Sequence, residues 1–377
     1  EPIADIAFAP DERTLVSAGA DGAIRLWDLT TGVARVLQAA EPIDTIEFTP
    51  DGAWLLGLGL WDAASTQGRT VWIWELATGA AHELPRHPER YADARLAPDG
   101  RTLAVITCAG GVDLVDVASR AVRRLRPGVP PSSRHRTCPN DLAFSADGAL
   151  LAAETGRYQV DVIAVADGRL VRQFESSDSR PVLQTQFTVD GSRLLVLTSA
   201  GLVSWGVAAG DRQVVVTDDV AVRAFELVAD GARLVLAGID RTVRVWTVAD
   251  GGFKVLARSD GPLTAMTLTP DHRRAVLGSD DHLVRVMDLA GGGSRALRGH
   301  TGSITETVAS ASGAWIASSS VDGTVRVWRA DDAQRAMVAI GNGRRGAASH
   351  RRSDVRNPAP QAHGEVAIVD RVSFDVR

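Results

Sequence analysis

The chain has 377 residues, of which 45% are hydrophobic, and a formal net charge of -5. This hydrophobic content argues against a disordered chain, and the acidic balance argues against a nucleic-acid-binding surface, which needs a basic excess. No run of about 18 apolar residues occurs, so we expect no membrane-spanning helix.

The start and the composition of the chain suggest a fragment or processed part of a larger protein. The chain begins without Met or a signal-peptide pattern, and "EPIADIAF" at 1–8 already alternates like a strand. Its 41 basic residues include one lysine, Lys254, and this arginine bias, with abundant Ala and Gly, suggests a GC-rich bacterial genome. Two cysteines, Cys108 and Cys138, are too few for a disulfide framework and favour a cytoplasmic location.

The chain consists of eight similar units of about 40 residues. Each unit has a turn residue, which is Asp in seven units: Asp11, Asp51, Asp99, Asp147, Asp190, Asp230, Asp271 and Ser312. Each then has an apolar residue, which is Trp in five units: Trp27, Trp74, Val115, Ile163, Trp205, Trp246, Met287 and Trp328. Such a period indicates supersecondary units that bury their faces against one another.

Each unit contains four short segments in which apolar and polar residues alternate. "DRTVRVW" at 240–246 and "DGTVRVW" at 322–328 each predict a turn followed by a strand with one buried face. Four antiparallel strands per ~40 residues, here termed a, b, c and d, are typical of a propeller blade. The pattern covers 1–340, and the last unit has its own fourth strand at 334–340.

Three segments resemble the WD-repeat family: "SAGADGAIRLWDLTTG" at 17–32, "GIDRTVRVWTVADG" at 238–251, and 299–328, which opens on Gly299 and His300. The resemblance implies an all-β fold, a closed propeller of four-stranded antiparallel blades. We count eight blades; family members most often have seven, which is the alternative count.

The region 341–377 is a polar, Arg-bearing tail after the propeller. It opens on a G-x-G-x-x-G match that resembles a dinucleotide-binding turn, but the following residues lack an apolar helical face and include Pro358 and Pro360. We therefore predict a tail without a cofactor, with 365–370 as a candidate for one short strand.

Four residues of the last unit, His300, Ser318, Asp322 and Trp328, resemble a catalytic set. In the family the corresponding residues form a buried hydrogen-bond network that stabilises the blade. Ser320 has the same strand parity as Ser318 and is the alternative hydroxyl. We favour the structural role over nucleophilic catalysis, because triads are recognised by geometry rather than by residue types.

Strand a has an acidic residue at a shared position in four units: Asp5, Asp93, Asp141 and Glu306. Strand a is the innermost strand of a blade, so these side chains are candidates for a site in the central channel. The alternative is that they accept hydrogen bonds from nearby backbone.

Two insertions distinguish the second to fourth units. They lengthen the b–c loop at 59–69 and the d–a loop at 126–139, and both kinds of loop open on the same face of a propeller. Loops on a rigid scaffold often hold binding residues, and Trp and Arg are enriched at binding hot spots. The candidate partner-binding residues are Trp61, Asp62, Arg90, Arg134, His135 and Arg136.

The resemblance implies a non-catalytic interaction scaffold or sensor module, which we place in a larger bacterial signalling or regulatory protein. We expect a protein or peptide partner with an acidic and an apolar element, and no nucleic acid or membrane. Cys108, His135 and Cys138 offer three zinc ligands, but their spacing is not that of a zinc site, so we expect no metal or cofactor. The alternative is a propeller enzyme or small-ligand binder that uses the channel carboxylates.

Overall fold

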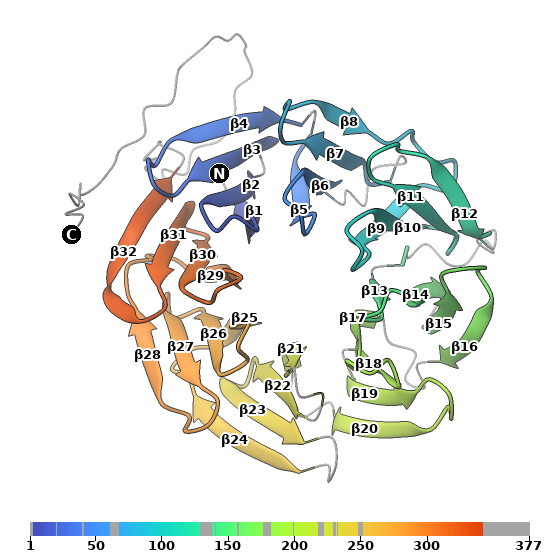
Figure 1. Cartoon of the computed structure of the whole chain (residues 1–377). Helices are drawn as coiled ribbons and strands as arrows, with labels where there is room; N and C mark the ends of the chain where they lie inside the picture. The colour runs from blue at the N-terminus through green and yellow to red at the C-terminus, as the bar shows by residue number, and fades with distance from the viewer. Residues whose placement is uncertain are drawn as a thin grey trace, which may run out of the picture.

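In the computed structural model the chain forms a closed ring of eight four-stranded antiparallel sheets around a common centre (Figure 1). The structure describes residues 3–19, 21–39, 41–60, 68–128, 138–139, 141–156, 158–175, 182–198, 200–217, 222–228, 231, 233–247 and 252–341. The named secondary-structure elements of these residues are all β-strands, which confirms the all-β propeller. The eight sheets exclude the seven-bladed alternative.

Each blade takes four consecutive strands, ordered from the channel outward. Blades 1 to 4 are β1 (Ile3–Phe8), β2 (Thr14–Gly19), β3 (Ala23–Asp28), β4 (Ala34–Gln38); β5 (Ile43–Phe48), β6 (Trp54–Gly59), β7 (Val71–Glu75), β8 (Ala81–Glu83); β9 (Tyr91–Leu96), β10 (Thr102–Thr107), β11 (Val112–Asp116), β12 (Val122–Arg126); and β13 (Leu142–Phe144), β14 (Leu150–Gly156), β15 (Gln159–Ala164), β16 (Leu170–Glu175).

The second half of the ring repeats this plan. Blades 5 to 8 are β17 (Val182–Phe187), β18 (Arg193–Thr198), β19 (Gly201–Gly206), β20 (Arg212–Thr217); β21 (Val222–Leu227), β22 (Arg233–Gly238), β23 (Thr242–Thr247), β24 (Phe253–Arg258); β25 (Leu263–Leu268), β26 (Arg274–Ser279), β27 (Val284–Asp288), β28 (Ser294–Leu297); and β29 (Ile304–Ala309), β30 (Trp315–Ser320), β31 (Thr324–Arg329), β32 (Asp332–Gly341). The fourth strand of blade 8, expected at 334–340, is therefore present.

Asp side chains hold the a–b turns of blades 1 to 5 and 7. In blade 2, Asp51 Oδ1 accepts a hydrogen bond from the Ala53 N–H at 2.9 Å, and Gly52 supplies the left-handed conformation with φ of 67°. The a–b and c–d turns lie at one end of the blades, which we call the lower face. The b–c turns and the d–a connections lie at the other end, the upper face.

The core lies between neighbouring blades. The second strand of a blade is almost entirely buried, because both of its faces are covered by adjacent sheets, and in β22 it is an almost continuous apolar run. One cluster joins Ile6, Leu15 and Trp27 of blade 1 to Val325 and Val327 of blade 8. The ring is also closed by a hydrogen bond of 2.6 Å from the Ser312 hydroxyl to Glu12 Oε2.

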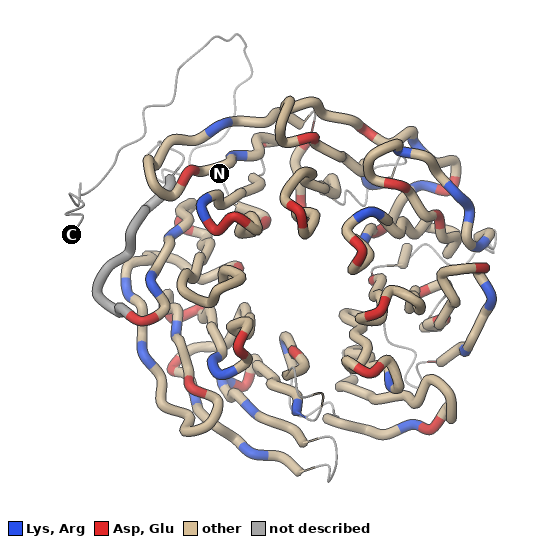
Figure 2. The backbone as a smooth tube through the Cα atoms, in the orientation of Figure 1, with Lys and Arg blue, Asp and Glu red and all other residues tan. Residues whose placement is uncertain are grey.

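At four of the junctions, side chains from the outermost strand of one blade bind the next blade. Arginines on β4, β12, β16 and β28 donate to carbonyl oxygens beyond the third strand of the following blade. The bonds are Arg35 to Leu76 (2.9 Å), Arg123 to Val165 (3.2 Å), Arg172 to Val207 (3.2 Å) and Arg295 to Asp331 (2.8 Å). Figure 2 shows basic residues recurring along these outer strands and acidic residues along the inner ones.

The blades differ in the residue two positions before the Trp position of strand c. In blades 1, 6 and 7 it is an arginine that pairs with the Asp of the preceding b–c turn: Arg25 with Asp21 (2.8 Å), Arg244 with Asp240 (2.7 Å) and Arg285 with Asp281 (2.6 Å). In blades 3 and 4 it is a buried aspartate, Asp113 or Asp161. These two aspartates instead face arginines of β12.

No helix long and apolar enough to cross a membrane occurs within the residues that the structure describes.

Candidate functional site

The described ends of the two inserted loops come together on the upper face. Gly68, which closes the loop after β6, lies against Arg90, because a Cβ atom on Gly68 would be 2.6 Å from the Arg90 Cβ. The Arg69 N–H donates to the Tyr91 carbonyl at 3.0 Å, and the Cys108 N–H donates to the Arg90 carbonyl at 2.8 Å. Arg90 therefore lies between the loop of blade 2 and the b–c turn of blade 3.

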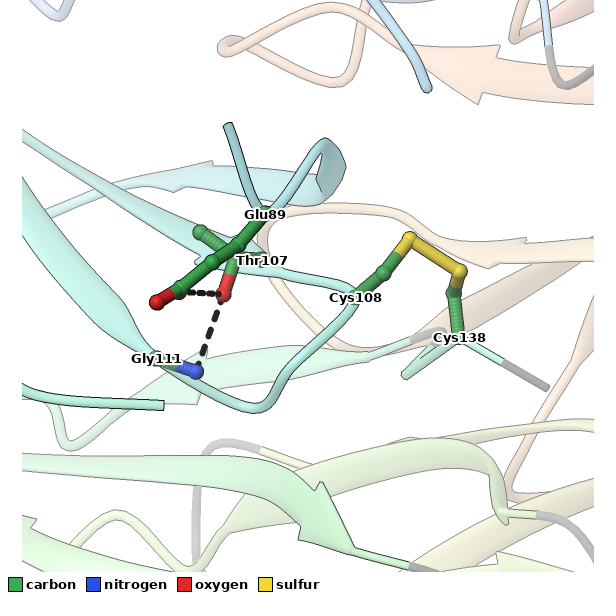
Figure 3. Close-up of a disulfide and its surroundings, with 5 residues drawn as sticks. All are labelled: Glu89, Thr107, Cys108, Gly111 and Cys138. Carbon is green, nitrogen blue, oxygen red and sulfur yellow. Dashed lines mark hydrogen bonds between the residues drawn. A yellow bond between two sulfur atoms is a disulfide. The ribbon is translucent and has the colours of Figure 1, made fainter. Parts of the chain in front are cut away.

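A disulfide joins this b–c turn to the second insertion. Cys108 follows β10, Cys138 ends the connection from β12 toward β13, and their Cα atoms are 4.3 Å apart (Figure 3). The adjacent Thr107 hydroxyl donates to Glu89 Oε2 at 2.9 Å and accepts from the Gly111 N–H at 3.0 Å. The disulfide ties the turn to the second insertion, and the bond from Thr107 to Glu89 ties it to the 85–90 loop.

The disulfide changes two expectations drawn from the cysteines. We expected the two cysteines, too few for a disulfide framework, to lie in a reducing compartment; they are paired with each other, and neither sulfur is then a thiolate that can bind zinc. Disulfides persist mainly in oxidising compartments, so cysteine usage no longer favours a cytoplasmic location. Within the described part of the chain, no group of three or more His, Cys, Asp or Glu residues has metal-site geometry.

The remaining residues proposed for partner binding were Trp61, Asp62, Arg134, His135 and Arg136. All five lie outside the described residues. Arg90 is described, is half-buried, and has a left-handed backbone with φ of 60°. Non-glycine residues seldom adopt this conformation, and they often do so at functional positions.

A charged cluster lies beside Arg90 on the outer side of blade 3. His87 is six residues before Asp93, as His300 is six residues before Glu306, so the two histidines occupy equivalent positions. The Nε2 atom of His87 is 3.7 Å from Asp113 Oδ2. The sequence interpretation missed His87, because Arg86 precedes it where Gly299 precedes His300; the six-residue spacing was the available signal.

Arg124 links this cluster to the neighbouring loop. Its Nε lies 2.5 Å from Asp113 Oδ1, and its Nη1 lies 3.6 Å from Glu89. Its Nη2 lies 2.5 Å from His87 Nε2. Asp113 is almost fully buried, whereas Arg124 and Glu89 are partly exposed. The upper face of blade 3 thus has accessible charged groups of both signs beside Arg90.

The hydrogen bonds expected in blade 8 are present in the structure. His300 Nε2 lies 2.9 Å from the Ser318 hydroxyl, and its Nδ1 lies 2.9 Å from Asp322 Oδ2. The Trp328 indole N–H donates to the same Ser318 hydroxyl at 3.1 Å, so Ser318 rather than Ser320 completes the network. Ser318 is fully buried.

This network sets the protonation of its members. Burial lowers the pKa of His300, and this outweighs the raising effect of Asp322. Burial alone would raise the pKa of Asp322, but hydrogen bonds from Thr324, Thr301 and His300 outweigh it and lower that pKa to about 2. A buried serine that already accepts an indole N–H has no path to a substrate, so the arrangement stabilises the blade.

The channel carboxylates hydrogen-bond to backbone, mostly across blade junctions. Asp5 Oδ2 accepts from the Ile46 N–H of blade 2 at 2.6 Å, and its Oδ1 accepts from Ile6 at 2.7 Å. Asp141 accepts from the Thr185 N–H of blade 5. Sequence reasoning missed Glu226, which accepts from Leu268 of blade 7 at 2.9 Å.

Burial raises the pKa of all four predicted channel carboxylates. For Asp141 the pKa rises to about 7, against the lowering effects of Arg95 and of the bond from Thr185. Burial and the adjacent Asp5 raise the pKa of Glu306 well above its usual value. Burial also raises the pKa of Asp93, whose Oδ2 is 3.9 Å from Arg95.

Comparisons with known proteins point to WD repeats. The family model "WD domain, G-beta repeat" matches residues 1–28 and 293–329, which include three strands each of blades 1 and 8. The WD repeat-containing protein SL1-17 of Schistosoma mansoni is 30% identical over 158 residues, 41% of this chain and 48% of that protein. These matches support the resemblance found in the sequence.

Two further relatives have similar coverage of this chain. The target of rapamycin complex subunit LST8 of Rattus norvegicus is 26% identical over 188 residues, 48% of this chain and 55% of that protein. Periodic tryptophan protein 2 of Arabidopsis thaliana is 26% identical over 179 residues, 47% of this chain and 16% of that protein. The chain matches about half the length of the first two relatives.

Proposed function

We propose that this chain is a WD-repeat propeller that acts as a non-catalytic interaction scaffold or sensor module and binds a protein or peptide on its upper face over blades 2 to 4. The observation that carries the proposal is the convergence of both insertions at Arg90. Gly68 lies against Arg90, and Cys108, bonded to Cys138, donates to its carbonyl. Three blades thereby contribute to one surface.

The residue types on these loops support protein recognition. Trp61 offers a rigid apolar group, and Arg134 and Arg136 offer forked hydrogen-bond donors. The basic side chains favour an acidic element in the partner, and Trp61 favours an apolar one. We therefore propose a peptide segment that combines both elements.

The relatives support an assembly role. One of them is named as a subunit of the target of rapamycin complex, and another as a WD repeat-containing protein. We further propose that the propeller belongs to a bacterial signalling or regulatory protein; the bacterial origin is suggested by the arginine bias of its composition.

The alternative, an enzyme or small-ligand binder that uses the channel, is favoured by one observation. The pKa of Asp141 is raised to about 7, and displaced pKa values are frequent at catalytic sites. The oxygens of Asp5 and Asp141 nevertheless accept backbone N–H groups, mostly of the following blade. A role in joining blades accounts for both the burial and the pKa shifts, so we prefer the scaffold.

Partner capture with matched variants tests the proposal. The double variant Trp61→Ala, Arg136→Ala should lose proteins that the wild-type chain retains from a lysate of the source organism. Arg101→Ala, an exposed residue of a lower-face turn, is the control and should retain them. Unchanged capture by the double variant would show that the upper face over blades 2 to 4 is not the binding site.

A further inference from the structure

A groove lies on the lower face between blades 1 and 2, opposite the proposed partner surface. Its volume is about 670 Å³, and its apolar wall includes Leu26, Ala34, Phe48 and Leu76. Val33 at its edge is 67% exposed. Leu26, Phe48 and Leu76 also pack in the core cluster between the two blades, so the wall is a rigid surface.

Three carboxylates line the same groove: Asp11, Asp28 and Asp51. Asp28 Oδ1 accepts the N–H groups of Thr30 and Thr31 at 2.8 Å, and this lowers the pKa of Asp28. Hydrogen bonds from Thr49 and the Ala53 N–H lower the pKa of Asp51. Both carboxylates are therefore ionised at neutral pH.

The groove has a negative balance. Its one basic lining residue, Arg35, donates to the Leu76 carbonyl at 2.9 Å. One guanidinium thus faces three carboxylates. A basic, extended segment with an apolar side chain matches this combination of charge and surface.

Blade 1 has a small residue at a position where blade 7 has an arginine that crosses to the next blade. Thr14 is three residues after the turn Asp and pairs with Asp28 across the strands. The equivalent residue of blade 7 is Arg274, which pairs with Asp288 and donates across the junction to the Ala330 carbonyl of blade 8 at 3.4 Å. No comparable side chain crosses from Thr14.

The sequence beyond β32 has the complementary composition. Residues 342–377 lie outside the described residues, and five arginines and one acid occur between 344 and 360. The stretch "RRSDVRNPAP" at 351–360 combines Arg351, Arg352 and Arg356 with Val355 and two prolines.

The segment leaves the propeller at the blade next to blade 1 and can extend past the height of a blade. Gly341 ends β32 opposite Thr324, at the upper face of blade 8, and blade 8 is the neighbour of blade 1. The ten residues 342–351 span about 33 Å when extended. That exceeds the height of a six-residue strand, about 20 Å.

We propose that residues 351–360 of this chain bind in the groove between blades 1 and 2, with their arginines on Asp11, Asp28 and Asp51 and Val355 on the apolar wall. The tail then passes from the upper face of blade 8 to the lower face of blade 2. It bridges the junction at which the ring closes.

The single lysine of the chain allows a direct test. In full-length Arg352→Lys, a zero-length carbodiimide cross-link from the introduced amine should form to Asp11, Asp28 or Asp51 and be located by peptide mass spectrometry. Arg371→Lys, in the same tail but outside the proposed segment, is the matched control and should not give these cross-links. Products of Lys254, on β24 of blade 6, provide the internal reference.

A second change closes the groove without removing its carboxylates. Adding Thr14→Arg, which places in blade 1 the side chain that Arg274 supplies in blade 7, should abolish the cross-links of Arg352→Lys. If that variant does not fold, Val33→Arg at the exposed edge serves instead. Equal cross-linking in the Arg371→Lys control, or cross-links unaffected by the groove variants, would overturn the proposal. So would products that join isotopically labelled to unlabelled copies, which would show binding between molecules.

Discussion

Blades 1, 6 and 7 and blades 3 and 4 have the same strand order but opposite arrangements of charge. In the first group a partly exposed arginine of strand c reaches back to the Asp of its own b–c turn, as Arg244 does to Asp240. In the second group strand c has a buried aspartate, and the arginine comes from β12. Arg126 of blade 3 lies 2.9 Å from Asp161 of blade 4.

The difference shows that the backbone of a blade does not depend on one set of side chains. Asp161 is fully buried and also accepts bonds from the Thr155 hydroxyl at 2.6 Å and the Gln173 amide at 2.8 Å. A buried charge needs such partners, whereas the Arg244 pair remains in contact with water. We therefore expect the irregular blades to be more sensitive to the loss of one charged group.

The largest effect is expected at Asp161. Asp161→Ala leaves Arg126 without its acidic partner and opens two buried hydrogen bonds, so it should lower the free energy of unfolding by about 3–5 kcal/mol. Arg244→Ala in blade 6 breaks a partly exposed pair and should cost about 0–1 kcal/mol. Urea unfolding of both variants measures the difference, and equal effects would remove the distinction between the two groups of blades.

The disulfide should rank second. It closes a segment with a sequence separation of 30, and such a cross-link typically contributes about 2–4 kcal/mol. Cys108→Ser with Cys138→Ser should therefore lower the unfolding midpoint, and a thiol reductant should affect the wild-type chain but not the double variant. An unchanged midpoint would show that blades 3 and 4 do not depend on this bond.

The equivalent histidines sharpen the comparison further. His300→Ala should cost about 1–3 kcal/mol, because it removes one buried hydrogen bond each from Ser318 and Asp322 of blade 8. His87→Ala in blade 3 should cost less than about 1 kcal/mol, because the partly exposed Arg124 keeps its pair with Asp113 and can bind water in place of the imidazole. The two unfolding curves decide the order, and a more damaging His87→Ala would reverse it.

The smallest effect concerns pH. Because the pKa of Asp141 is raised to about 7, the folded chain keeps a proton between about pH 4 and 7 that the unfolded chain releases. This contribution to stability is present below the unfolded pKa and is lost as pH rises to about 7. Asp141→Asn should therefore be more stable than the wild-type chain at pH 7 and similar to it near pH 4.

The control for this measurement is Asp322 in blade 8, whose pKa is lowered to about 2. Its contribution is present above the unfolded pKa of 3.8 and is lost as pH falls toward 2. Asp322→Asn should thus be less stable than the wild-type chain at pH 7, and the difference should shrink in acid. The two substitutions must give opposite signs at pH 7.

The fold was predictable because its signals are local and repeated. Turn aspartates and alternating β-branched residues mark blades even where Val115 or Ile163 replaces the tryptophan. The blade 8 network was also accessible, since one unit contains its whole pattern. The sequence could not show that Ser318 rather than Ser320 belongs to the network, because both serines have the same strand parity. Only the position of the Trp328 indole distinguishes them.

The features that sequence reasoning missed join residues across strands or blades. The pairing of Asp113 with Arg124 depends on the register of β11 and β12. The ion pair between Arg126 and Asp161 depends on the packing of two blades. The disulfide joins positions whose proximity follows from the turn geometry of blade 3. Trp61 and Arg136, outside the described residues, remain predictions.

Each sheet is made of consecutive strands only, so among the described strands no hydrogen-bonded ladder crosses from blade 8 to blade 1. The closure consists of side chains, including Ser312 on Glu12 and the apolar cluster around Trp27 and Val327. Removal or duplication of one whole repeat would leave every ladder intact and would require only that two new neighbours fit. Gene duplication can therefore change the size of such a ring in whole-blade steps, and the junction between blades 8 and 1 is where the ring can open without breaking backbone pairing.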